Sequence, residues 1–268
     1  MTFNVQVVFD CADPDQLARF WADALGYKIQ DPPPGYDSWP AFLEAMNVPK
    51  DQWDRASAIV DPEGKGPRLF FQKVPEPKVV KNRVHLDLRP TTTMAEEVER
   101  LRDLGAAPIR FVDEGHGSWT VMGDPEGNEF CVLRAGAEGG KRDRGGIDSV
   151  VVDSNDWRRV ADFWIAALAY RELEAGESGV EIVGDRDGDP MLSFVTVPEA
   201  KTVKNRVHLD VRPTGSMTEE VERVTALGGT VRGYIEEGGS FWTQMRDPEG
   251  NEFCILRGPD DGWSPDEL

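Results

Sequence analysis

The heptapeptide KNRVHLD occupies Lys81–Asp87 and returns unchanged at Lys204–Asp210. A second segment, DPEGNEFC, occupies Asp124–Cys131 and returns unchanged at Asp247–Cys254. Both pairs lie 123 positions apart (204 − 81 and 247 − 124), so the chain between them carries no net insertion. Self-similarity at a fixed period is typical of duplicated domains. The sequence therefore consists of two copies of one unit.

The two copies differ in length near their starts. Phe20-Trp21 matches Phe163-Trp164 with an offset of 143 (163 − 20), so copy one carries 20 additional residues (143 − 123). This insertion falls within 28–57, is rich in proline and aromatic residues, and contains a helix-like stretch over 41–46. An insertion on one copy alone can cover a pocket as a lid or pack against the neighbouring domain. Both alternatives stay open.

Composition sets the domain limits. We expect residues 1–135 to form the first domain and 147–258 the second, joined by the small, polar and glycine-rich linker 136–146. Residues 259–268 have the composition of an acidic tail.

Charge and cysteine content exclude several classes of protein. The 268 residues carry a formal net charge of -19, which repels nucleic acid and anionic membranes. The N-terminus lacks the basic and apolar regions of a signal peptide, and no apolar run is long enough to cross a bilayer. Three cysteines, an odd number, do not make a disulfide framework. We expect a cytoplasmic protein with reduced thiols, either a monomer with an internal pseudo-dimer or a homodimer.

Each copy contains the same order of elements twice. Asp13-Pro14 predicts the start of a helix whose apolar residues recur at helical spacing over 17–25, and Gly26 predicts its end. Short β-rich runs precede and follow this helix. A strand at 83–88, a capping box at Thr93–Glu96 and a stop at Gly105 begin the pattern again. The chain thus predicts four βαβββ modules, an α+β fold.

These modules resemble the vicinal oxygen chelate (VOC) superfamily. Paired βαβββ modules, a first helix of the pattern Arg-Phe-Trp-x-x-x-Leu-Gly, and a closing Asp-Pro-Glu-Gly-Asn turn are similar to its glyoxalase-like domains, including the bleomycin-resistance proteins. The resemblance implies two tandem glyoxalase-like domains with curved mixed sheets. It also implies that the two modules of a domain form a cup whose concave face binds a small molecule.

Alternation along the strands places polar side chains in the cup. His85 with Asp87, and His208 with Asp210, are candidate catalytic pairs, although each also fits a structural hydrogen-bond network. The cup, the closing strands, the hairpin end and the insertion supply further candidates. The candidate ligand-binding residues are Arg83, His116, Trp119, Glu129, Cys131, Trp39, Arg206, Trp242, Glu252 and Cys254.

The resemblance implies metal ligands on particular strands, and few positions match. If copy one holds a divalent ion, the set is Gln6, Gln72, His85 and Cys131, with cysteine where the family has glutamate. Neither copy provides a carboxylate at that position, so no cofactor is expected and a metal is the lesser alternative.

Two functions follow from these features. The first is metal-independent binding of a small organic molecule in the cup, as in the bleomycin-resistance proteins. The second is a glyoxalase-type lyase or isomerase that uses His85 or His208 as general base or with an atypical metal set. An extradiol dioxygenase is disfavoured because its two histidines and glutamate are not all present. No nucleic-acid or membrane partner is expected.

Overall fold

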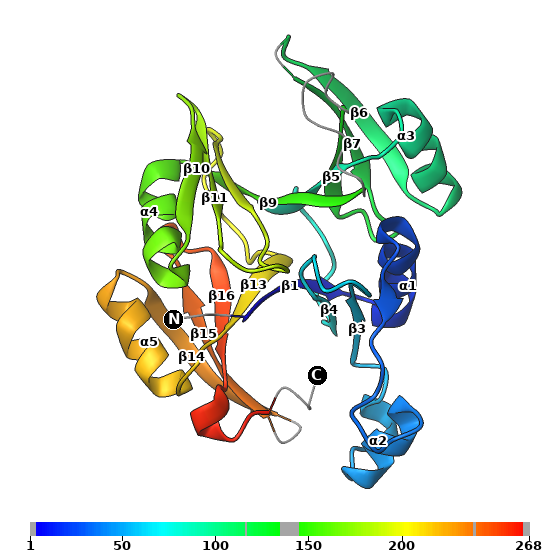
Figure 1. Ribbon diagram of the computed structural model, residues 1–268, viewed down its shortest axis with the longest axis vertical. Helices are drawn as coiled ribbons and strands as arrows, with labels where there is room; N and C mark the ends of the chain where they lie inside the picture. The colour runs from blue at the N-terminus through cyan, green and yellow to red at the C-terminus, as the bar shows by residue number, and fades with distance from the viewer. Residues whose placement is uncertain (1–3, 116, 135–144, 238–239, 265–268) are drawn as a thin grey trace.

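The computed structural model describes residues 4–115, 117–134, 145–237 and 240–264, which form two eight-stranded mixed sheets and five α-helices (Figure 1). The elements of the first copy are β1 (Asn4–Cys11), α1 (Pro14–Leu25), β2 (Lys28–Ile29), α2 (Trp39–Ala45), η1 (Lys50–Gln52), β3 (Ala56–Val60), β4 (Leu69–Lys73), β5 (Val84–Arg89), α3 (Met94–Asp103), β6 (Ala107–Asp113), β7 (Ser118–Gly123) and β8 (Glu129–Leu133). Those of the second are β9 (Gly146–Ser154), α4 (Trp157–Leu168), β10 (Arg171–Ala175), β11 (Gly179–Val183), β12 (Leu192–Thr196), β13 (Val207–Arg212), α5 (Met217–Ala226), β14 (Thr230–Glu237), β15 (Ser240–Arg246), β16 (Glu252–Leu256) and η2 (Pro259–Asp261).

The predicted four modules and α+β class are confirmed. The α1 helix begins where the sequence predicts it: the Asp13 side chain accepts the backbone N–H of Gln16. It ends at Gly26, whose φ of 68° lies in the left-handed region that glycine adopts without strain. The Thr93–Glu96 capping box forms at the start of α3.

The pairing of the modules differs from the expectation that one copy builds one cup. Sheet A has the order β14-β15-β16-β13-β1-β4-β3-β2, and sheet B has the order β10-β11-β12-β9-β5-β8-β7-β6. Each sheet therefore joins one module of copy one to one module of copy two. The central pairs are antiparallel, β1 with β13 and β5 with β9. Pairing across copies satisfies the edge hydrogen bonds of all four central strands.

The helices pack on one face of each sheet, and the apolar residues of the strands point toward them. Val7 and Phe9 of β1, Leu86 of β5 and Leu209 of β13 lie in the core with Trp21 of α1. The residues between them in sequence point to the opposite face of each sheet, because side chains alternate along a strand. We call these opposite faces open face A and open face B.

The repeated Asp-Pro-Glu-Gly-Asn turn joins the two sheets. In copy one it connects β7 to β8 in sheet B, yet Asp124 accepts a hydrogen bond from Trp21 Nε1 at 3.2 Å. Glu126 accepts the backbone N–H groups of Ala12 and Asp13, where β1 of sheet A leads into α1. Trp21 also packs on Phe130 with ring centroids 5.1 Å apart. The turn is structural, and it fixes α1 between the sheets.

The insertion and the tail both belong to sheet A. The α2 helix stands apart from the other helices at the lower right of Figure 1. Arg55, after η1, forms an ion pair with Glu237 at the end of β14, so the insertion contacts a module of the other copy. The described part of the tail forms η2, where Asp261 accepts the backbone N–H of Met217 at the start of α5. Among the described residues, no helix has the length and apolar character needed to span a bilayer.

Candidate functional site

Each open face holds a cluster of one histidine, one aspartate and one cysteine. His85, Asp87 and Cys131 lie on face B, and one potential ligand atom from each lies within 4.8 Å of the other two. His208, Asp210 and Cys254 form the same cluster on face A. Strand register explains the clusters, because Asp87 lies beside Cys131 and Asp210 beside Cys254 in parallel pairs. The sequence-predicted pairs are thus brought together at the centre of each sheet.

Several polar atoms of these clusters have no partner. His85 Nδ1 and Asp87 Oδ1 on face B are buried without a hydrogen bond, as are His208 Nδ1 and Asp210 Oδ1 on face A. The histidine Nε2 atoms lie 3.6 and 3.5 Å from their aspartates, too far for a good hydrogen bond. A buried polar group without a partner costs about 1–3 kcal/mol, and native proteins retain few of them. These four atoms mark both open faces as sites that a ligand or ion can complete.

Burial perturbs the titration of the face B cluster. Desolvation lowers the pKa of His85 to about 4, so its imidazole is neutral at pH 7. Desolvation raises the pKa of Asp87 to about 7, opposed by a hydrogen bond from the Cys131 thiol. A carboxyl group with a pKa near 7 is better suited to accept a proton at neutral pH than an imidazole with a pKa near 4. The electrostatics therefore favour Asp87 over His85 as a base.

A buried chain of polar residues distinguishes face A. Gln6 Nε2 donates to Asp210 Oδ2 at 2.9 Å, and Gln6 Oε1 accepts a hydrogen bond from Arg68 Nη1. Arg68 Nε donates to Gln30 Oε1 at 2.7 Å, and the guanidinium lies over the Phe70 ring, 5.0 Å from its centroid. Desolvation and the Arg212 guanidinium together lower the pKa of Arg68 to about 10, against the opposing effect of the Asp210 carboxylate. Arg68 still carries a positive charge at pH 7.

Among the residues that the structure describes, face B has no counterpart of this Gln6–Arg68–Gln30 hydrogen-bond series. Ser149 pairs with Asp87 in sheet B as Gln6 pairs with Asp210 in sheet A. The backbone carbonyl of Met191 accepts from Val150 as that of Arg68 accepts from Val7, so Met191 occupies the place of Arg68. The two faces thus share a His-Asp-Cys cluster but differ in the charge beside it.

The predicted metal set Gln6, Gln72, His85 and Cys131 is wrong as a set. Gln6 and Gln72 lie in sheet A, whereas His85 and Cys131 lie in sheet B. The error follows from assigning both modules of a copy to one cup. The donors that do meet, an imidazole nitrogen, a carboxylate oxygen and a sulfur, are ones that zinc accepts, and they leave a fourth position open. Face B fits a divalent cation better than face A, where Arg68 takes the Gln6 oxygen and adds a positive charge.

Four of the predicted ligand-binding residues contact the segments that join β4 to β5 and β12 to β13. Glu129 pairs with Lys78 at 2.9 Å and accepts the backbone N–H of Asn82, and Glu252 does the same for Lys201 and Asn205. Arg83 Nη1 donates to the Glu199 carbonyl, and Arg206 Nη1 donates to the Glu76 carbonyl. Arg83 Nη2 also lies 3.7 Å from a carboxylate oxygen of Glu249 in the other copy. Arg83 and Arg206 also line a cavity of about 500 Å³ between these segments, so their ligand-binding role stays a prediction beside the structural one.

The three predicted tryptophans lie in two different parts of the structure, the open faces and the insertion. Trp119 pairs with Leu133, and Trp242 pairs with Leu256, two residues beyond the cluster cysteines and on the same face. They form part of the walls of faces B and A. Trp39 lies in the insertion, where its Nε1 donates to the Gln30 carbonyl at 2.7 Å. His116 lies outside the described residues.

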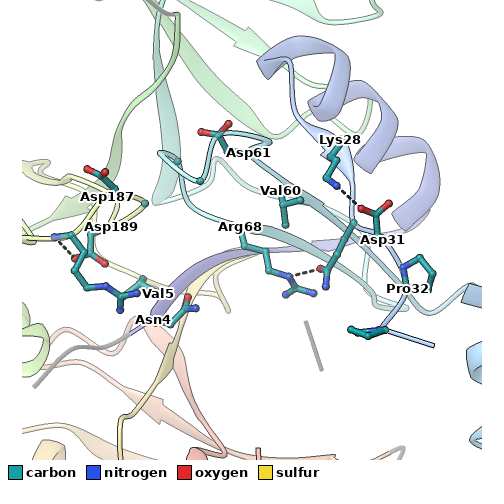
Figure 2. A pocket seen from close by; sticks show the side chains of 16 residues that line it. Asn4, Val5, Lys28, Asp31, Pro32, Val60, Asp61, Arg68, Asp187 and Asp189 are labelled. Carbon is teal, nitrogen blue, oxygen red and sulfur yellow. Dashed lines mark hydrogen bonds and ion pairs between the residues drawn. The ribbon is translucent and has the colours of Figure 1, made fainter. Parts of the chain in front are cut away.

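Arg68 and Gln30 were missed as site residues. Arg68 borders a cavity of about 530 Å³ together with Asn4, Gln30 and Val60 (Figure 2). The β11–β12 turn, with Asp187 and Asp189, closes its other side. The sequence did carry a signal: Arg68 begins the alternating run that puts Phe70 and Gln72 on one face. The signal was overlooked because copy two has methionine at that place, outside the repeated motifs.

Comparison with known proteins settles the family. The model of the family described as "Glyoxalase-like domain" matches residues 6–133 and 149–256. The chain belongs to this family. The fold agrees with that of glyoxalase I from Zea mays, at a TM-score of 0.61 and 14% identity over 96% of this chain and 94% of that one. A mutant of the same maize enzyme gives a TM-score of 0.63 at 14% identity, over 96% and 95% of the two chains. No curated protein sequence matches the chain.

At 14% identity, the likeness of this glyoxalase-like chain to maize glyoxalase I shows a shared fold and nothing further. Its match covers both copies, as the duplication predicts. The assignment to the VOC superfamily made from the sequence is confirmed.

Proposed function

We propose that the chain binds a small organic molecule on open face A. The observation that carries this proposal is the pair of buried, unpartnered atoms His208 Nδ1 and Asp210 Oδ1 at the centre of that face. In the described part of the chain, the core that the helices cover lies on the other side of the sheet, so no helix supplies their partners. A ligand that donates a hydrogen bond to Asp210 Oδ1, and donates to or accepts from His208 Nδ1, removes the free-energy cost of leaving these two atoms unpaired.

Face A also has the better enclosure. Phe70 and Trp242 supply aromatic walls, and small-molecule sites typically combine apolar walls with a few polar groups. The Arg55–Glu237 ion pair joins the insertion to β14, and Trp263 of the tail lies over Arg212 at 4.2 Å. The insertion has no equivalent in the other copy, so face B lacks this rim. These features favour face A as the principal site.

A second candidate function is a lyase or isomerase of the glyoxalase type. The His85–Asp87–Cys131 cluster favours it, because these three side chains are close enough to hold one divalent ion. Such an ion, when bound, polarises a carbonyl oxygen of a substrate. The protein residues would orient the ion, exclude water and, in the metal-free alternative, accept a proton at the Asp87 carboxylate.

Ligand screening of matched variants tests the first candidate. Wild type, His208→Ala and His85→Ala are compared against a metabolite panel by thermal shift and native mass spectrometry. We expect His208→Ala to lose the ligands that the wild type binds and His85→Ala to retain them. Loss in His85→Ala with retention in His208→Ala contradicts the assignment to face A, and a panel without any binder contradicts the function itself.

A further inference from the structure

The Arg68 guanidinium has only neutral partners. Its two hydrogen bonds go to the side-chain oxygens of Gln30 and Gln6, and it stacks on Phe70. Among residues 4–115, 117–134, 145–237 and 240–264, no ion pair involves this guanidinium; the Asp210 carboxylate, which Gln6 also contacts, acts on it only at longer range. A charge that is largely removed from water without an opposite charge is expensive, and proteins usually pair it. Arg68 is therefore arranged for something other than stability.

Three carboxylates that line the cavity, those of Asp31, Asp61 and Asp189, are already engaged with other groups. Lys28 forms an ion pair with Asp31. Asp61 accepts the backbone N–H groups of Glu63 and Lys65, and Asp189 accepts that of Arg186. Figure 2 shows Arg68 in the middle of the cavity with these acidic groups around its rim. The two glutamines hold the guanidinium in place without neutralising it.

Its hydrogen-bonding capacity is not exhausted. A guanidinium has five N–H donors, and the two bonds to Gln30 and Gln6 use one at Nε and one at Nη1. The remaining donors include both at Nη2, so the edge formed by Nη1 and Nη2 can receive two oxygens side by side. This is the geometry in which arginine binds a carboxylate.

We propose that Arg68 is the anion-binding residue of open face A and that the ligand of this face is a small organic monocarboxylate. The inference rests on the proposed function, since it names the chemical class of the molecule bound there. A positive charge without a direct ion-pair partner favours a monoanion over a dianion, particularly in a protein of net charge -19. The Phe70 ring, on which the guanidinium lies, receives the apolar part of the molecule.

The second copy supplies the matched variant. Met191 occupies the equivalent position in sheet B, so Arg68→Met introduces a residue that the same fold already accepts there. Lys28→Met is the control, because it removes a positive charge from the same cavity that is already paired with Asp31. Arg68→Gln repeats the test with a polar side chain.

Phenylacetate and phenylacetamide serve as probes because they have the same shape and differ in charge. In calorimetric titrations we expect the wild type and Lys28→Met to bind phenylacetate about tenfold or more tightly than phenylacetamide, since a charge-assisted bidentate contact contributes more than a neutral one. In Arg68→Met and Arg68→Gln this preference disappears. Without any probe, Arg68→Met melts at a higher temperature than the wild type, because an unpaired charge has been removed.

Equal affinity of the wild type for the two probes, or an unchanged preference in Arg68→Met, overturns the assignment of the anion site. In that case, neutral compounds that bind face A and are lost in His208→Ala leave the proposed function standing. Failure of the wild type to bind either probe also contradicts the carboxylate class. If the metabolite panel yields no binder either, the function fails together with the inference.

Discussion

Glu126 accepts the backbone N–H of Asp13 at 2.8 Å, although the two residues lie on different sheets. Glu249 makes the same contact with Asp156 in the other copy. Each glutamate belongs to the turn before the closing strand of one sheet and holds the helix start that follows the first strand of the other. The repeated turn motif thus fastens sheet A to sheet B twice.

Replacement of Glu126 by alanine is expected to destabilise the protein by about 1–3 kcal/mol, because the N–H groups of Ala12 and Asp13 lose their acceptor. Glu126→Gln keeps an acceptor oxygen and should lose less. Urea denaturation measures both. Equal losses in the two variants would show that the charge matters and the hydrogen bonds do not.

The tail contributes to stability through Asp261. Its carboxylate accepts the N–H groups of Met217 and Gly258, so Asp261→Ala should cost about 1–2 kcal/mol, as the loss of a helix cap does. The neighbouring Asp260 is exposed, and Asp260→Ala should change the free energy of unfolding by less than about 0.5 kcal/mol. A destabilised Asp260→Ala with an unaffected Asp261→Ala would contradict the structure of η2.

Protonation of Asp124 should favour the folded state. Burial raises the pKa of Asp124 to about 6 from the ordinary aspartate value of 3.8, because desolvation outweighs its hydrogen bonds. The folded protein therefore binds this proton more tightly than the unfolded chain. The stability it contributes is fully present below pH 3.8 and is lost as the pH rises through about 6.

The difference in the free energy of unfolding between the wild type and Asp124→Asn isolates this group. That difference should shrink by about 3 kcal/mol at most between pH 4 and pH 7, since one pKa unit corresponds to about 1.4 kcal/mol. Chemical denaturation at a series of pH values measures it. A difference that grows with pH would reverse the sign and contradict the raised pKa.

Metal titration tests which of the two open faces binds the divalent ion that the second candidate function uses. We expect Co²⁺ added to the metal-free protein to give a thiolate charge-transfer band that Cys131→Ala removes and Cys254→Ala leaves, because Arg68 repels a cation from face A. The affinity loss in Cys131→Ala should be about tenfold or more. Loss of the band only in Cys254→Ala would place the metal on face A instead.

Local signals predicted most of the fold. The Asp13 cap, the Gly26 stop and the Thr93 capping box each act within a few residues, so the sequence shows them directly. The pairing of modules was not predictable in the same way. Strands β1 and β13 are brought together by contacts about 200 residues apart in the chain, such as Gln6 with Asp210, and the two copies offer equivalent edges for that pairing. Because the two copies have the same strand patterns, the sequence does not distinguish pairing of modules within one copy from pairing across the two copies.

The same limit applies to the site. Alternation correctly put His85 and Asp87 on one face, and likewise His208 and Asp210. It could not show that Arg83 turns to the connecting segment after β12, because that depends on where the other copy lies. The hydrogen bonds of Arg68 to Gln6 and Gln30 join residues 62 and 38 positions apart in the sequence, so they are visible only in three dimensions.

Since β1 and β13 pair across the copies, the first and last quarters of the chain share one sheet, while the middle two quarters share the other. Half of the polypeptide, expressed alone, would have both of its central strands unsatisfied and would need a second molecule to cover them. Fusion removes that dependence on concentration. Fusion also allows the two open faces to differ in sequence. Arg68, the inserted helix α2 and Trp263 all belong to the sheet of open face A, whereas Met191 takes the place of Arg68 in the other sheet.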